Sequence, residues 1–87
     1  MDIENIRKRL IYRSWHRGTR EMDLILGSFA DRYVPGFSDN ELQQYEVLLN
    51  VADPDLYDWI AGRAEIPANF SGMVVDKLKN HQLSKGL

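Results

Sequence analysis

The stretch of this sequence best equipped for chemistry runs from Arg17 to Glu21 (Arg-Gly-Thr-Arg-Glu) and directly follows His16. It places two guanidinium groups, a carboxylate and an imidazole within six consecutive residues. Such groups form charge-assisted hydrogen bonds, and binding residues are common on loops held by a rigid scaffold. The stretch therefore indicates a charged contact with another molecule.

The same residues also fit ordinary turn chemistry. Arg17 would lie at the C-terminus of one helix and Glu21 in the first turn of the next, where the helix dipole favours each charge. Between them, Gly18 supplies the backbone freedom that a helix stop requires. Arg20 is the exception, because the dipole disfavours a cation at a helix N-terminus. The residues alone leave both interpretations open.

Signatures of catalysis are missing from the sequence. There is no glycine-rich phosphate loop, no nucleophile elbow and no His-Glu-x-x-His pattern. The chain has no cysteine, which excludes disulfides and cysteine-based metal sites. The two histidines, His16 and His81, are predicted to be surface or capping residues. The acids of the middle region crowd predicted helix starts, where they cap backbone N–H groups. We expect no catalytic residue, no metal site and no enzyme activity.

Five helices are predicted to position the charged stretch. Apolar residues recur at spacings of three and four, and no segment alternates as a strand would. The helices are expected over about residues 3–16, 20–34, 38–52, 53–62 and 68–82. Together they predict an all-α fold, a compact antiparallel five-helix bundle. Residues 1–87 are expected to form one domain, with a frayed tail after about residue 82.

Local capping signals mark the helix boundaries. Ser38 and Glu41 form a predicted capping box, and Thr19 is a predicted N-cap. Asp53 before Pro54 predicts an N-cap followed by a proline at the first helical position. Stops are expected at Gly18, Pro35-Gly36 and Gly62, whereas Gly72 leaves the start of the last helix open.

The apolar faces of these helices predict the core. Its expected members are Ile3, Ile6, Leu10, Ile11, Met22, Ile25, Leu26, Phe29, Tyr33, Leu42, Tyr45, Leu48, Leu49, Ala52, Leu56, Trp59, Ile60, Phe70, Met73, Val74 and Leu78. Trp59 is expected to anchor the short fourth helix in the core. For Trp15, near the charged stretch, core and interface roles are both open.

Composition and charge set limits on the class of protein. The chain has 87 residues, of which 44% are hydrophobic and 28% charged, and its net charge is −2. A chain this short has room for one modest core and not for a deep active-site cavity. Residues 1–20 carry +4, residues 21–62 carry −8 and residues 63–87 carry +2. No apolar run resembles a signal peptide or membrane span, so we expect a cytoplasmic protein, or its organellar equivalent, without membrane insertion.

Arg17-Gly18-x-x-Glu21 resembles the RGxxE signature of the SdhE family (also called YgfY), small flavinylation factors that assemble succinate dehydrogenase. The resemblance extends to the helix start at Phe37-Ser38 and to residues 49–60, with their Asp-Pro-Asp-Leu-aromatic-x-Trp pattern. It covers roughly residues 5–80. Chain length and helix order agree with it.

The resemblance implies a five-helix factor that promotes covalent attachment of FAD to the flavoprotein subunit of succinate dehydrogenase. The bond forms to a histidine of the flavoprotein, so the factor binds that subunit and holds no FAD stably itself. The flavoprotein of fumarate reductase is open as a second partner, and a monomer is expected. Arg17, Gly18 and Glu21 would be the functional motif. The partner-binding residues would also include the neighbouring Arg20, Asp23 and His16.

Two other classes compete with this interpretation. A nucleic-acid binder could use the six cations of residues 1–20 to contact phosphate. The pI of about 5.6 argues against it, because such domains are usually strongly basic. An antitoxin or a cytoskeleton-regulating protein is a third possibility. Binding that falls steeply with salt and needs no flavoprotein would favour the nucleic-acid binder, and co-purification of a flavoprotein would discriminate against the third possibility.

Overall fold

The computed structural model describes residues 2–84, and every regular element in that range is helical. The helices are α1 (Ile3–Trp15), α2 (Arg20–Tyr33), α3 (Asp39–Leu49), α4 (Asp53–Ile60) and α5 (Met73–Ser84). Two 3₁₀ turns, η1 (Val34–Gly36) and η2 (Ala68–Phe70), interrupt the connections. The predicted all-α fold with five α-helices is confirmed for the described part of the chain.

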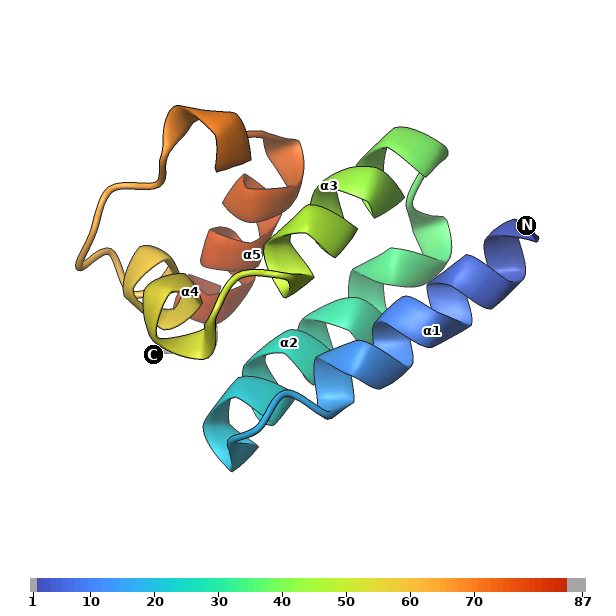
Figure 1. Ribbon diagram of the computed structural model, residues 1–87, viewed down its shortest axis with the longest axis horizontal. Coiled ribbons are helices and arrows are strands. Elements are labelled where there is room, and N and C mark those ends of the chain that lie inside the picture. Colours follow the sequence, from blue (N-terminus) through green and yellow to red (C-terminus); the bar gives the residue numbers. More distant parts are fainter. Residues whose placement is uncertain (1, 85–87) are drawn as a thin grey trace.

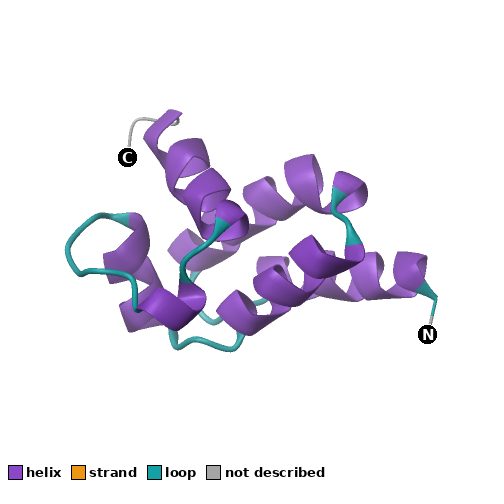
Figure 2. Ribbon diagram, turned by 90° about the horizontal axis from the view of Figure 1, so that it is seen from above, coloured by secondary structure: helices purple, strands orange, loops and turns teal. Residues whose placement is uncertain are grey.

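The helices pack as a hairpin of α1 and α2, with α3 and α5 against it and α4 on α5. Helices α1 and α2 lie side by side and form the most extensive helix–helix interface, and α3 packs on α1. Helix α5 contacts α3 and α2, and the short α4 packs on α5 (Figure 1). The segments joining α1 to α2 and α3 to α4 both lie in the half of the molecule away from the N-terminus (Figure 1), and Figure 2 shows the same helices and loops from above. Among the described residues, none of the helices combines the length and the apolar character that a membrane crossing requires.

Several predicted boundaries are confirmed. The Ser38 hydroxyl accepts from the Glu41 backbone N–H at 3.2 Å, and the Glu41 carboxylate accepts from the Ser38 N–H at 2.9 Å. This is the predicted capping box, which satisfies two backbone donors that the helix itself leaves free. Thr19 caps α2 by accepting from the Met22 N–H at 3.2 Å.

Two predicted boundaries are wrong. The N-cap of α4 is Ala52, which makes no side-chain capping bond, and Asp53 is the first helical residue. The Asp53 carboxylate is occupied by a long-range contact described below and does not cap its own helix. The last helix starts at Met73 and not near Ala68. Gly72, directly before it, has a φ of +157°, which a helical residue cannot have. Helix α5 reaches Ser84, and the remainder of the expected frayed tail lies outside the described residues.

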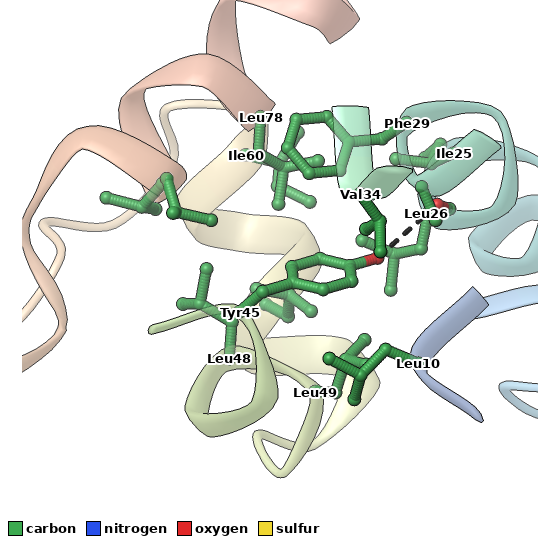
Figure 3. Packing of buried hydrophobic residues seen from close by; sticks show 14 of the residues in the cluster. Leu10, Ile25, Leu26, Phe29, Val34, Tyr45, Leu48, Leu49, Ile60 and Leu78 are labelled. Carbon is green, nitrogen blue, oxygen red and sulfur yellow. Dashed lines mark hydrogen bonds between the residues drawn. The ribbon is translucent and has the colours of Figure 1, made fainter. Parts of the chain in front are cut away.

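A buried tyrosine joins three helices at the centre of the core (Figure 3). The Tyr45 hydroxyl oxygen lies 2.5 Å from the Ser14 hydroxyl oxygen and 3.4 Å from the Leu26 carbonyl oxygen. Ser14 in turn donates to the Leu10 carbonyl at 2.7 Å. Burial raises the pKa of Tyr45 well above its ordinary value, because the charged phenolate would lose its hydration. The polar groups are satisfied within an apolar core, which ties α1, α2 and α3 to one register.

The predicted core is largely confirmed, with three corrections. His81 is buried and not a surface residue, because α5 packs on α2 and brings its ring edge-on to Phe29 and to within 3.0 Å of the Ser28 hydroxyl. Met73 is 64% exposed, since it is the first residue of its helix. Ala52 is exposed because α3 ends three residues earlier. The expected burial of Trp59 is confirmed.

Candidate docking site at the first helical hairpin

The side chain of Arg17 points inward and bridges to the loop between α3 and α4. Its Nε donates to Asp53 Oδ1 at 2.8 Å, and a terminal nitrogen pairs with the same carboxylate at 2.8 Å. The other donors reach the carbonyls of Val51, at 2.7 Å, and Leu49. Only 10% of the side chain is exposed. The guanidinium of Arg17 is therefore held inside the molecule and is not presented to solvent.

The bridge has a simple physical basis. The last turn of an α-helix leaves backbone carbonyls without intrahelical partners, and a nearby cation also interacts favourably with that end of the helix dipole. Leu49 is the last residue of α3, so Arg17 caps this helix from another part of the chain. The planar guanidinium can serve the carbonyls and the Asp53 carboxylate at once, because its donors form a rigid fork.

The backbone of the hairpin is fixed by a second set of contacts. Asp23 accepts from the Arg17 N–H at 2.5 Å and is half-buried, so its carboxylate stabilises the turn from the side of α2. Gly18 has a φ of +150°, a conformation that side-chain-bearing residues rarely adopt. A Cβ added at Gly18 would lie 3.7 Å from Asp53 Oδ2. Arg17 and Asp23, both predicted binding residues, thus contact each other within the hairpin, and Asp53 of the segment between α3 and α4 lies directly against Gly18.

Four positions of this hairpin face solvent. Gly18, Thr19, Arg20 and Glu21 are exposed, and within residues 2–84 neither Arg20 nor Glu21 has a hydrogen bond or ion pair through its side chain. A cation and an anion are therefore presented on adjacent residues, on a backbone held by Arg17. This arrangement suits recognition of a charged surface and offers no nucleophile or general base.

His16 extends the exposed surface along α1. Its ring stacks on Tyr12, with centroids 4.0 Å apart and planes 19° apart, and its Nδ1 lies 2.7 Å from the Tyr12 carbonyl oxygen. Both residues are exposed, as predicted for His16. The described residues contain no group of three or more histidines or acids that could hold a metal ion.

Trp15 lies between core and surface, the question that the sequence left open. Its indole ring lies on the backbone of α2 at Gly27. A Cβ added at Gly27 would lie closer to the ring atoms than van der Waals contact allows. The indole N–H donates to Asp31 Oδ1 at 3.2 Å. Trp15 therefore fastens the hairpin while remaining half-exposed.

Sequence reasoning missed the role of Asp53 and the stack of Tyr12 on His16. Asp53 carried a signal, an acid at a helix start, but this signal favours local capping equally well. The spacing of four between Tyr12 and His16 places the two rings one helical turn apart, which could have predicted their contact.

Comparison with known proteins agrees with the family resemblance found in the sequence. Residues 8–82 match the family model Sdh5, described as "Flavinator of succinate dehydrogenase". A protein of Dictyostelium discoideum is 40% identical over 80 residues, which cover 92% of this chain and 57% of that protein. One from Debaryomyces hansenii is 40% identical over 83 residues, covering 95% and 55% respectively. A third, from Cryptococcus neoformans, is 36% identical over 86 residues, covering 98% and 49%.

All three relatives are named "Succinate dehydrogenase assembly factor 2, mitochondrial". The chain spans about half the length of these curated relatives. Their names correct the expectation of a cytoplasmic protein, since each places its protein in mitochondria. The resemblance carried by Arg17, Gly18 and Glu21 is confirmed, and the chain belongs to the Sdh5 family, the flavinators of succinate dehydrogenase.

Proposed function

We propose that this protein binds the flavoprotein subunit of succinate dehydrogenase and promotes covalent attachment of FAD to it. The observation that carries the proposal is the family match over residues 8–82, which includes the whole charged hairpin. The hairpin supports it physically, because Arg20 and Glu21 are exposed and without partners among the described residues, on a backbone that is held rigidly. A preformed turn loses little conformational entropy when it docks.

The factor acts by docking and not as an enzyme. Arg20, Glu21 and His16 contact the flavoprotein, whereas Arg17 and Asp23 hold the hairpin in its binding shape. The bond to FAD forms on the flavoprotein itself, and the factor stabilises the arrangement in which it forms. A small helical protein whose exposed motif offers only charged and aromatic groups suits such a role.

A reconstitution with purified components tests this function. The apo-flavoprotein subunit is incubated with FAD, with and without the factor, and covalent flavin is read as fluorescence of the subunit on a denaturing gel. The factor should raise the rate of flavin attachment. Equal rates with and without the factor, from a subunit that is folded and binds FAD, would contradict the proposal.

The finer features of the function are also proposals. The factor acts as a monomer in the compartment of its flavoprotein, which for the named relatives is the mitochondrion. It holds no FAD stably, so equilibrium dialysis of the factor alone against FAD should leave equal flavin concentrations on both sides. The flavoprotein of fumarate reductase is a second partner, to be tested by substituting it in the same reconstitution.

A further inference from the structure

We infer that the docking surface consists of two turns and not of the RGxxE hairpin alone. The first turn is residues 16–21, and the second turn is residues 50–55, between α3 and α4. Arg17 is the positioning residue that holds the second turn against the first. The inference rests on the proposed function and specifies the surface through which the flavoprotein subunit is bound.

The contacts of Arg17 join the two turns directly. Every hydrogen bond of its side chain ends on residues 49–53, at the Asp53 carboxylate and at the carbonyls of Leu49 and Val51. The space above Gly18 is bounded by the Asp53 carboxylate, 3.7 Å from where a Cβ would stand. A partner that approaches Gly18 closely therefore meets the second turn as well.

The second turn is anchored on both sides and exposed in the middle. Leu49 and Leu56 are buried in the core, which fixes the ends of the segment. Ala52, Pro54 and Asp55 between them are exposed. Pro54, in the first turn of α4, restricts the backbone further. A rigid, exposed segment beside a docking motif can be used in the same interface without an additional ordering cost.

The charges of the two turns indicate which side chains the flavoprotein places against them. The Asp53 charge is neutralised by Arg17, whereas Asp55 and Glu21 are exposed and have no ion pair among the described residues. Arg20 is the one exposed cation of the two turns. We therefore expect the flavoprotein to place lysine or arginine side chains against Glu21 and against Asp55.

Charge reversal at the second turn tests the surface. Asp55→Lys is compared with Asp76→Lys, since Asp76 is also an exposed acid in a first helical turn, but on α5. Both substitutions change the net charge equally. Asp55→Lys should weaken binding to the apo-flavoprotein about ten-fold or more, measured by calorimetry, while Asp76→Lys binds as wild type does.

The outcomes separate the inference from the proposed function. If wild-type factor binds and stimulates flavin attachment, but Asp55→Lys binds as tightly as Asp76→Lys, the two-turn surface is wrong and the function stands. If wild-type factor does not bind the flavoprotein, both are wrong.

A double-mutant cycle tests the positioning role of Arg17. Arg17→Lys keeps the charge but cannot serve the carboxylate and both carbonyls with one planar fork. Amides of residues 50–55 should then exchange hydrogen faster, and Asp55→Lys should weaken binding less in this background than in wild type. Additive effects on affinity would contradict a positioning role, even if Arg17→Lys lowers the melting temperature.

Discussion

The guanidinium of Arg17 and the carboxylate of Asp53, thirty-six residues apart in sequence, form a part-buried ion pair with atoms 2.8 Å apart. This contact ties the RGxxE motif to the start of α4. Arg17 of the motif is therefore held by internal contacts, whereas Glu21 is exposed and has no internal partner among the described residues. The two should respond differently to substitution.

Replacing Arg17 with alanine should destabilise the fold strongly. The change leaves the Asp53 carboxylate and two backbone carbonyls without their donor, and breaking a buried ion pair costs about 3–5 kcal/mol. Because solvent reaches part of this pair, we expect about 3 kcal/mol, or a fall in melting temperature of roughly 12–24 °C. Urea unfolding followed by circular dichroism measures it. A loss below about 0.5 kcal/mol would show that the bridge does not form in solution.

Replacing Gly27 with alanine should destabilise the hairpin through Trp15. The added methyl group would overlap the indole ring, which must move or lose its bond to Asp31. Overpacking of this kind costs about 1–3 kcal/mol. Gly36→Ala is the matched control, because nothing lies within 4 Å of its added Cβ and its φ is not positive. Equal stability of the two variants would contradict the packing of Trp15 on α2.

The buried Tyr45 should make stability fall at high pH. Its folded-state pKa is raised, so above about pH 10 the unfolded chain releases a phenol proton that the folded protein retains. The free energy of unfolding then decreases as the pH rises above about 10. Tyr45→Phe should lose about 1 kcal/mol at neutral pH, through the missing hydrogen bonds, but show a shallower decline. Urea unfolding of both proteins across this pH range measures the difference, and parallel curves would contradict it.

The local parts of the fold could be predicted from the sequence. The capping box of Ser38 and Glu41 needs only residues three apart, so its geometry follows once the helix forms. The positive φ at Gly18 is equally local. Periodicity identified most of the core, because the spacing of three and four determines which side chains share a helix face.

Contacts between distant segments could not be predicted in this way. Whether Arg17 faces solvent or Asp53 depends on how α3 and α4 pack beside the hairpin. No local sequence pattern specifies that packing. The burial of His81 likewise requires α5 to cover Ser28 and Phe29 of α2. The motif itself was recognised by its residue types, but the division between internal and exposed members came only from the structure.

Docking of the hairpin onto the flavoprotein is tested by titrating factor into the flavinylation reaction. Glu21→Ala should lower stability by only about 0.3–1 kcal/mol, as expected for an acid in an exposed first helical turn. Losing a charged contact in the complex costs about 2–5 kcal/mol of binding, so the half-maximal factor concentration should rise roughly thirty-fold or more. The plateau should be unchanged, since excess factor restores occupancy. Glu65→Ala, which removes an exposed acid of the loop after α4, should behave as wild type. A Glu21→Ala curve that coincides with those of wild type and Glu65→Ala would contradict docking through the hairpin.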